Sequence, residues 1–386
     1  MAKKEALRIR AIELYKQGKS IASISKELGQ SRQWVYKWID RYNTKGKDWF
    51  VSESCTPHCK PNKTSLNIEL EVIRMRHQLK ESPYLESGAY AIFHKLQNEG
   101  IKAPSVATIN RILKQHNLTN KKVRFKKQGL DYPVDPINMQ MMDLIGPRYI
   151  RGGHRYYLLT IISNETRHAG VYPILAKTGE NITHSIIQFW KDYSIPDFIQ
   201  MDNELSFKGS NRYPRGLGQF LRTALSLNVT PIFIPISEPW RNGVIERFNQ
   251  KVERTLLQQE HKSFEDLLLH AHEFVKIHNT YHHYSTLEHK TPLELDNEYV
   301  WLLQALPHDY QISKRPALDD NNLNEIHFVR LVRSDLIVNI LNTEIEVKPE
   351  LMHTYIEANL LINQHRLLIK QDNKIVQQFE FIMPLC

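Results

Sequence analysis

Three acidic residues lie where one predicted element gives way to the next. Asp143 and Asp202 each end a short apolar run, and Glu246 lies one turn inside a helix that Asn242-Gly243 would open. Carboxylates are hard oxygen ligands that suit Mg²⁺ or Mn²⁺. If the three elements pack side by side, these acids can hold two such ions about 4 Å apart and catalyse an in-line phosphoryl transfer.

Each acid taken alone also has a simpler interpretation. Aspartate is favoured in turns, and glutamate is favoured in the first turn of a helix. The set of three, behind two candidate DNA-binding modules, favours the metal site. We expect Asp143 to bridge both ions, with one ion held by Asp202 and the other by Glu246.

The elements that must position these acids are predicted between residues 137 and 300. Apolar or alternating runs at 139–145, 156–163 and 168–174 predict an antiparallel meander. Helices at 181–193 and 216–227 then alternate with strands at 198–201 and 229–234. This order predicts a mixed five-stranded sheet flanked by helices, with Asp143 and Asp202 at neighbouring strand ends. A helix from 243 to 258 would carry Glu246, Asn249 and Gln250 on one face.

Two helical modules precede this α/β region. Residues 1–45 predict three short helices with a tight glycine turn before the third, a helix-turn-helix pattern that a generic three-helix bundle also produces. Residues 65–118 repeat the plan after a turn-rich linker at 46–64. The last helix of each module would read the major groove of DNA. Its exposed donors would be Arg32, Gln33, Tyr36 and Lys37 in the first module, and Thr108, Arg111 and Lys114 in the second.

The whole chain has a formal net charge of +9, and its basic residues are concentrated in the first third. Residues 1–127 hold 26 Lys+Arg against 11 Asp+Glu, whereas the remainder holds 25 against 31. A basic front half suits a polyanionic partner, although a solvated lysine-rich surface has the same composition. A basic linker at 119–136 would contact phosphates, as would the segment after Asp202. The residues are Lys121, Lys122, Arg124, Lys126 and Lys127 in the linker, and Lys208, Arg212 and Arg215 in the segment.

The composition argues against membrane and secreted proteins. No run of about 18 apolar residues is present, and residues 1–15 lack the apolar centre of a secretory signal. Three cysteines argue for a reducing compartment, so we expect a cytoplasmic protein. Neither Cys55-Thr-Pro-His58-Cys59 nor the histidines of 270–289 show the four-ligand grouping of structural zinc. We expect those histidines at the surface or facing phosphate.

The C-terminal region predicts strands alone. Residues 320–386 contain six short apolar or alternating runs, at 326–332, 336–341, 344–347, 355–362, 366–369 and 374–381. Their spacing predicts a small antiparallel β-barrel. The chain as a whole is therefore expected to be multidomain: two all-α modules, a central α/β core and a C-terminal barrel.

The motifs around the three acids resemble those of a known family. Asp143, Asp202 and Glu246, set in MDLIGP, MDNELSF and PWRNGVIERFNQ, resemble the triad of the DDE transposases of bacterial insertion sequences, in the retroviral-integrase-like superfamily. The resemblance covers about 138–295 and includes HNTYHHYSTLEHKTPLEL at 278–295. Glu204 departs from the family, which commonly has glycine there, and His282-His283-Tyr284 replaces Arg-Pro-His. Neither departure removes a metal ligand.

The resemblance implies an RNase H-like core and a specific activity. The protein would bind transposon ends, cleave them by metal-dependent hydrolysis, and join the freed 3′-OH groups to target DNA. The resemblance also implies two Mg²⁺ ions per active site, with Mn²⁺ able to substitute, and a homo-oligomer, a dimer or tetramer, that pairs two ends of double-stranded DNA. Two alternatives stay open. One is a catalytically silent, sequence-specific DNA-binding regulator, against which the intact triad argues. The other is a metal-dependent nuclease without strand transfer.

Overall fold

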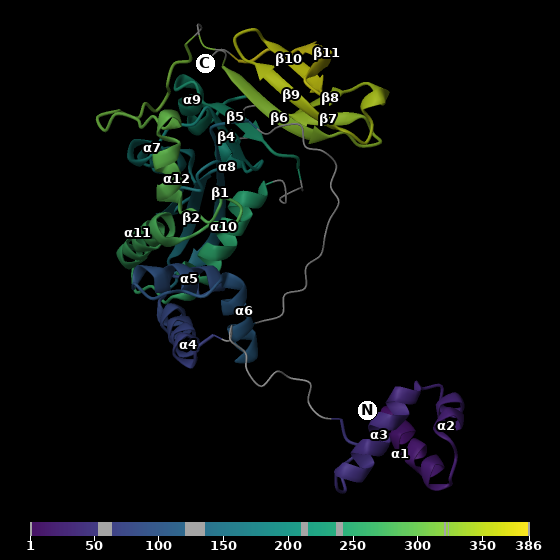
Figure 1. Cartoon of the computed structure of the whole chain (residues 1–386). Coiled ribbons are helices and arrows are strands. Elements are labelled where there is room, and N and C mark those ends of the chain that lie inside the picture. Colours follow the sequence, from purple (N-terminus) through teal and green to yellow (C-terminus); the bar gives the residue numbers. More distant parts are fainter. Residues whose placement is uncertain are drawn as a thin grey trace. The chain divides into compact units, whose positions relative to one another are not determined.

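The computed structural model describes residues 2–52, 64–119, 136–209, 215–236, 242–319, 322 and 324–384. The chain forms two compact units, Met1–Thr64 and Ser65–Cys386 (Figure 1). Several residues singled out in the sequence lie outside the described part. They are Lys121, Lys122, Arg124, Lys126, Lys127, Arg212, Cys55, His58 and Cys59.

The first unit contains the three expected helices: α1 (Ala2–Lys16), α2 (Ile21–Leu28) and α3 (Arg32–Thr44). Ser20 and Ser31 cap α2 and α3, each accepting a hydrogen bond from a backbone N–H three residues on. Gly29 ends α2 in the left-handed conformation, with φ 63°, and so makes the tight turn before α3. The helices enclose a small apolar core that includes Leu14, Ile24 and Val35. The helix-turn-helix expected in this region is confirmed.

The second unit begins with three more helices, α4 (Leu66–Glu81), α5 (Ala89–Asn98) and α6 (Val106–Gln115). They repeat the plan of the first unit around their own core, in which Met75, Ile92 and Ile109 are fully buried. The turn between α4 and α5 reaches the α/β region that follows. The Tyr84 ring packs edge-on against Phe274 at 5.9 Å between centroids, and its hydroxyl donates to Gln259 Oε1 at 3.0 Å.

A nine-stranded sheet forms the centre of the rest of this unit, in the order β11-β10-β9-β6-β5-β4-β1-β2-β3. The strands are β1 (Met139–Tyr149), β2 (Arg155–Ser163), β3 (Ala169–Ile174), β4 (Phe198–Met201), β5 (Thr230–Phe233), β6 (Glu325–Leu331), β9 (Tyr355–Leu361), β10 (Arg366–Gln371) and β11 (Lys374–Glu380). Within β1–β5, the pairs β1–β2 and β2–β3 are antiparallel, and the pairs β1–β4 and β4–β5 are parallel. The mixed five-stranded core predicted from the sequence is therefore present.

Helices cover both faces of this core. They are α7 (Gly179–Asp192), α8 (Leu205–Lys208), α9 (Gln219–Ser226), α10 (Gly243–Arg254), α11 (Phe264–Tyr281) and α12 (Pro292–Glu298), with short 3-10 turns η2 (Leu256–Gln258), η3 (Val300–Leu302) and η4 (Pro349–Leu351). Apolar side chains of α7 and α9 pack with Met142 and Met201 in one cluster. Those of α10 and α11 pack with Met139 and Met141 in another. Successive residues of β1 thus contact opposite faces, as strand geometry requires.

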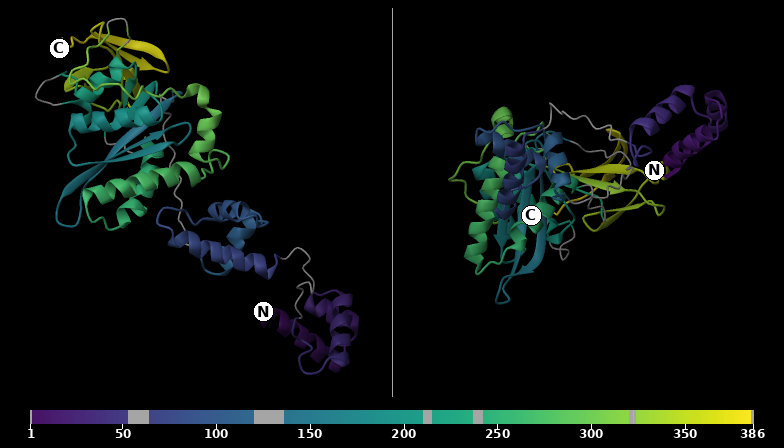
Figure 2. Two further views of the ribbon diagram at one scale, coloured as in Figure 1. Left: turned by 90° about the vertical axis from the view of Figure 1, so that its left-hand side faces the viewer. Right: turned by 60° about the horizontal axis from the view of Figure 1, so that its bottom comes forward.

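The C-terminal strands form at the expected places but not as the expected barrel. β6 pairs in parallel with β5, and β9, β10 and β11 follow as antiparallel neighbours in the same sheet. β7 (Ile337–Ile340) and β8 (Thr343–Glu346) form a separate two-stranded hairpin. The barrel prediction was wrong because alternating hydrophobicity specifies strands without specifying their neighbours. Here the open edge of β5 takes up β6, which leaves no unpaired edge at that side of the core (Figures 1 and 2).

No helix among the described residues is long and apolar enough to span a membrane.

Candidate active site

The parallel pairing of β1 with β4 brings Asp143 and Asp202 to the same level. Met139, Gln140 and Met141 pair with Phe198, Ile199 and Gln200. Two residues further along both strands, the same register places Asp143 beside Asp202. Side chains alternate along a strand, so Asp143 shares a face with Met141, which packs in the cluster beneath α10 and α11. Both aspartates are therefore directed towards the face that α10 covers.

One detail of the expected placement is wrong. Asp202 directly follows the end of β4, but Asp143 lies inside β1, which continues to Tyr149. The two parts of β1 are joined by an irregularity between Ile145 and Arg148, where Gly146-Pro147 interrupts the pairing with β2. A proline at such a bulge is compatible with a continuing strand, because the missing N–H is not needed there. The Gly-Pro pair therefore bends the strand instead of ending it.

Hydrogen bonds fix the carboxylate of Asp143 from two sides. Its Oδ1 accepts from the backbone N–H of Leu144, and its Oδ2 accepts from Asn249 Nδ2, both at 2.8 Å. Thr160, opposite on β2, donates its hydroxyl to Asn249 Oδ1 at 2.8 Å, which fixes the orientation of that amide. Asn249 lies on α10 one turn after Glu246. The helix that carries the third acid is thus tied directly to the first.

A buried amide pair fixes the start of α10 against β4. Gln200 Nε2 donates to Asn242 Oδ1 at 3.0 Å, and both side chains are buried. Asn242 is the residue before α10, but its side chain does not cap the helix. The side chain of Asn242 instead accepts a hydrogen bond from β4, the strand that ends next to Asp202. The pair therefore positions Glu246 relative to Asp202.

The two aspartates have perturbed acidities. Burial, together with the charges of Asp202 and Glu246, raises the pKa of Asp143 to about 7, despite the hydrogen bonds from Leu144 and Asn249. Burial and the charge of Glu204 also raise the pKa of Asp202. A partly buried carboxylate whose pKa is raised by neighbouring negative groups belongs to a donor set that a divalent cation would stabilise.

A cleft of about 600 Å³ opens beside Asp143 and Glu246, and Asn249, Gln250, Arg148 and Glu253 also line it. The three acids do not form a group whose ligand atoms all lie within 4.8 Å of one another; in the described part of the chain only His261, Asp266 and His270 do so. A two-ion site is wider than a one-ion site, because its ions lie about 4 Å apart. The oxygen donors and the open cleft fit hard divalent cations such as Mg²⁺.

Two basic side chains, Lys177 and Lys208, lie close enough to Asp202 to act on its charge. Lys177 forms an ion pair with Glu204 at 3.0 Å; burial acts to raise the pKa of Glu204, but Lys177 and Ser206 outweigh it, so the pKa is lowered. Burial and the charge of Arg330 lower the pKa of Lys208. Glu204 is thus already neutralised by a lysine.

Arg330 was not expected at this site. It lies on β6, is only 5% exposed, and donates to Asn203 Oδ1 at 3.0 Å and to the carbonyl of Ile234 at 3.1 Å. It therefore supports the residue after Asp202 from a strand of the C-terminal region. A sequence signal was lacking, because only the pairing of β6 with β5 brings Arg330 here.

The predicted DNA-contacting residues lie in several environments. Arg32, Gln33, Tyr36 and Lys37 are exposed on α3, and Arg111 and Lys114 are exposed on α6. Thr108 is half-buried and bonds with the capping residue Ser105. Arg215 donates to Thr343 Oγ1 and to the carbonyl of Ile382, and stacks on Phe381. Their contact with DNA stays a prediction.

The histidines of 270–289 are not uniformly at the surface, contrary to expectation. His278 is 1% exposed, and its Nδ1 lies 3.1 Å from Lys251 Nζ. Burial lowers the pKa of His278 well below its ordinary value. Burial also lowers the pKa of Lys251 to about 8. His270 lies in a group with His261 and Asp266 that offers three ligand atoms, not the four of structural zinc.

Comparisons with known proteins found matches to the first helical module and to part of the α/β region. A family model described as a homeodomain-like domain matches residues 2–48, and one described as an integrase core domain matches residues 227–292. Among solved structures, the HTLV-2 integrase catalytic core domain in complex with magnesium (trimeric form) is 16% identical, with 42% of this chain and 96% of that chain covered and a TM-score of 0.32. An intasome of simian T-cell lymphotropic virus in complex with PP2A regulatory subunit B56 gamma is 13% identical, with 76% and 95% covered and a TM-score of 0.37.

The identities and TM-scores of those structures are too low to carry an argument about function, so the assignment depends on the two domain matches. The integrase core match includes α10 and Glu246, and the homeodomain-like match includes the whole helix-turn-helix. The two matches make the chain similar to transposases and integrases: residues 2–48 match a homeodomain-like domain, and residues 227–292 match an integrase core domain.

Proposed function

We propose that the protein is a DNA transposase that cleaves the ends of its element and joins the freed 3′-OH groups to target DNA, with Asp143, Asp202 and Glu246 as its catalytic residues. The observation that carries the proposal is the register of β1 with β4, which sets the two aspartates side by side on the face covered by α10. The hydrogen bond from Asn249 to Asp143 then brings the helix of Glu246 to the same place.

Asp143, Asp202 and Glu246 would hold two Mg²⁺ ions, for which Mn²⁺ would substitute. When bound, such ions supply charge stabilisation and an activated oxygen nucleophile for in-line displacement at phosphorus.

Other residues of the chain would orient the carboxylates of the site and balance their charge. Leu144 N–H and Asn249 hold both oxygens of Asp143, and the backbone N–H of Glu204 donates to Asp202 Oδ1 at 3.0 Å. Ligands held in place before the reaction need no reorganisation when charge develops. Lys208 and Arg330 would add positive charge close to Asp202 and Asn203, which would attract a phosphate backbone.

Recognition of the ends is assigned to the helical modules. α3 would enter the major groove through Arg32, Gln33, Tyr36 and Lys37, and α6 through Thr108, Arg111 and Lys114. Phosphate contacts would come from Lys121, Lys122, Arg124, Lys126 and Lys127 in the linker and from Lys208, Arg212 and Arg215. Pairing two ends requires at least two copies of the chain, so a dimer or tetramer on DNA in the bacterial cytoplasm is part of the proposal.

The test is a joining reaction with labelled duplexes that carry the ends of the chain's own element, a plasmid target and Mg²⁺. One duplex is uncleaved, one is pre-cleaved to a 3′-OH, and a matched one is pre-cleaved to a 3′-deoxy end. We expect joined product from the first two duplexes but not from the 3′-deoxy duplex, and none with Asp202→Asn. Cutting of uncleaved ends without joining would support a nuclease, and binding without either reaction would support a regulator; both outcomes overturn the proposal.

A further inference from the structure

The loop before α11 and the first turns of that helix bring together two histidines and a carboxylate outside the candidate active site. We propose that His261, Asp266 and His270 bind one Zn²⁺ ion. The ligand atoms that these residues offer all lie within 4.8 Å of one another. The proposal is independent of the proposed function, because none of these residues lines the cleft of Asp143 and Glu246.

The two imidazoles face each other through the same ring atom. His261 Nδ1 and His270 Nδ1 lie 3.0 Å apart. Two nitrogens bound to one tetrahedral Zn²⁺, at Zn–N distances of about 2.0–2.1 Å, lie roughly 3.3 Å apart. The observed separation is therefore close to the separation that a shared ion requires. A direct N–H···N hydrogen bond is the competing explanation of this contact.

The environment of His261 fixes which of its nitrogens is available. Its Nε2 lies 3.0 Å from the carbonyl oxygen of Leu256, which can only accept, so Nε2 carries the proton. In the neutral ring the lone pair is then on Nδ1, the atom that faces His270. A backbone carbonyl that holds the remote N–H is the usual support of a metal-binding histidine. His261 is 6% exposed, so this orientation is held by packing.

The other two ligands come from one face of α11. Asp266 and His270 are one helical turn apart, and a carboxylate oxygen of Asp266 lies within 4.8 Å of the ligand nitrogens of both histidines. Oδ2 of Asp266 accepts from the backbone N–H of Lys262 at 2.8 Å, which directs the carboxylate towards the loop that carries His261. Two imidazoles and one carboxylate form a ligand set that suits zinc, with a fourth position for water.

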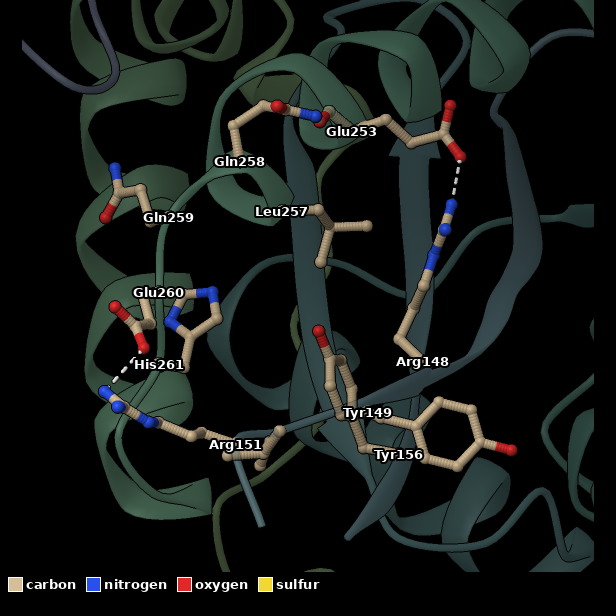
Figure 3. Close-up of a pocket in the computed structure, with 11 residues that line it drawn as sticks. Arg148, Tyr149, Arg151, Tyr156, Glu253, Leu257, Gln258, Gln259, Glu260 and His261 are labelled. Atoms are coloured by element: carbon tan, nitrogen blue, oxygen red, sulfur yellow. Dashed lines mark hydrogen bonds and ion pairs between the residues drawn. The ribbon is translucent and has the colours of Figure 1, made fainter. Parts of the chain in front are cut away.

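An ion at this place would join the end of η2 to the start of α11. It would also lie at the wall of a second cavity, of about 420 Å³, which His261 lines together with Arg148, Arg151 and Tyr156 (Figure 3). Both arginines there are paired with acids, Arg148 with Glu253 at 2.8 Å and Arg151 with Glu260 at 2.9 Å. A bound ion would therefore hold the connection that follows α10 in place, as a cross-link would.

The test measures zinc bound per chain in the full-length protein, after loading with Zn²⁺ and dialysis against a weak chelator. A reference protein with Asp202→Asn as its single substitution is compared with three proteins that add His270→Ala, Asp266→Asn or His272→Ala to it. His272 is an exposed histidine on the same helix and serves as the matched control. Because all four proteins carry Asp202→Asn, the carboxylate site contributes equally to each. We expect about one zinc fewer per chain in His270→Ala and Asp266→Asn and no change in His272→Ala.

A second measurement guards against loss of folding. In His270→Cys the new thiolate is itself a zinc ligand, so zinc binding should be retained, and Co²⁺ should give a thiolate-to-cobalt absorption band that the wild type lacks. Equal zinc in all variants, or no zinc retained by the reference protein, would overturn the proposal and leave a hydrogen bond between the two imidazoles.

Discussion

The carboxylate of Asp143 is held by two hydrogen bonds of 2.8 Å, from the backbone of Leu144 and from the side chain of Asn249. Asn249 itself is oriented by the hydroxyl of Thr160. This small network links β1, β2 and α10, so the orientation of the Asp143 carboxylate depends on the position of α10. Its middle member, Asn249, can be removed without removing any proposed metal ligand.

Asn249→Ala should reduce joining activity by about 10- to 100-fold, because a hydrogen bond to a charged group contributes about 1.5–3 kcal/mol and about 1.4 kcal/mol is a factor of ten. Binding to the ends should be unchanged. The rate of joined-product formation is the measurement, with Gln188→Ala, an exposed amide on α7, as the control. Wild-type activity in Asn249→Ala would show that the orientation of Asp143 does not depend on this contact.

Single residues also show how far the sequence is informative at this scale. Asp143, Asp202 and Glu246 stand out because each lies beside a chain-breaking pair or at the end of an apolar run. Their partners carry no such mark. Arg330 bonds to Asn203 from 127 positions further along the chain, and Asn249 bonds to Asp143 from 106 positions away. Contacts of this kind depend on which strands pair and on how the helices pack, and one sequence does not specify either.

At the scale of elements, α10 is anchored to β4 by the buried pair Gln200–Asn242. A buried amide that loses its partner leaves an unsatisfied polar group, which costs about 1–3 kcal/mol. The sequence suggested that Asn242-Gly243 opens a helix, and it does so, but the side chain of Asn242 bonds to the strand and not to the helix end. The turn-forming residues were enough to predict where α10 begins. The contact of Asn242 with β4 could be found only from the folded structure.

Asn242→Ala should therefore lower the free energy of unfolding by about 1–3 kcal/mol and reduce joining more than it reduces DNA binding. The check is a double-mutant cycle with Gln200→Ala, measured by denaturant unfolding. We expect the double variant to lose less stability than the sum of the two single variants. Strict additivity would mean that the two amides do not interact and that α10 is anchored elsewhere.

The seam between the core and the C-terminal strands contains a buried ionic group on β6. His327 lies 3.0 Å from Glu325 and 2.8 Å from Glu357 on β9. Burial acts to lower the pKa of His327, but the two glutamates outweigh it, so the pKa is raised above the ordinary value. The pKa of Glu325 is lowered: burial acts to raise it, and the hydrogen bond and charge of His327 outweigh that effect.

These shifts give stability a defined pH dependence. The contribution of His327 is complete below its unfolded-state pKa of about 6.5 and is lost as pH rises through the raised folded-state pKa. The contribution of Glu325 is lost as pH falls through its lowered pKa. The difference in unfolding free energy between wild type and His327→Gln should therefore be largest between about pH 4.5 and 6.5, at about 1–3 kcal/mol, and should shrink at alkaline pH.

Denaturant unfolding at several pH values measures this difference, with the exposed His353→Gln as a control that should follow the wild type. A difference that grows towards alkaline pH would have the wrong sign and would contradict the ionic seam.

At the scale of the whole molecule, the second unit is built on one continuous sheet. β6 joins the open edge of β5, and the Phe233 and Phe328 rings of these two strands stack at 5.1 Å between centroids. The sequence located all six C-terminal strands but not their partners, since period-two alternation is the same in a barrel and in an extended sheet. The α/β core was more predictable, because strand–helix–strand crossovers restrict the pairing to few topologies.

A chain that ends at Asp319 should therefore be unstable, because it would expose the edge of β5 and the apolar surface that β6 covers. We expect aggregation, or loss of the cooperative thermal transition, when it is compared with the full-length protein by light scattering and circular dichroism. An independent C-terminal barrel would instead leave a soluble, cooperatively folded fragment, and that result would contradict the continuous sheet.

The most direct test of the whole account is the joining activity of the three isosteric variants Asp143→Asn, Asp202→Asn and Glu246→Gln, measured beside their affinity for the element's ends. If the three acids form one catalytic site, each variant should bind the ends as the wild type does in the presence of Mg²⁺ and yet form no joined product. A variant that keeps joining at the wild-type rate would remove that residue from the site and contradict the account.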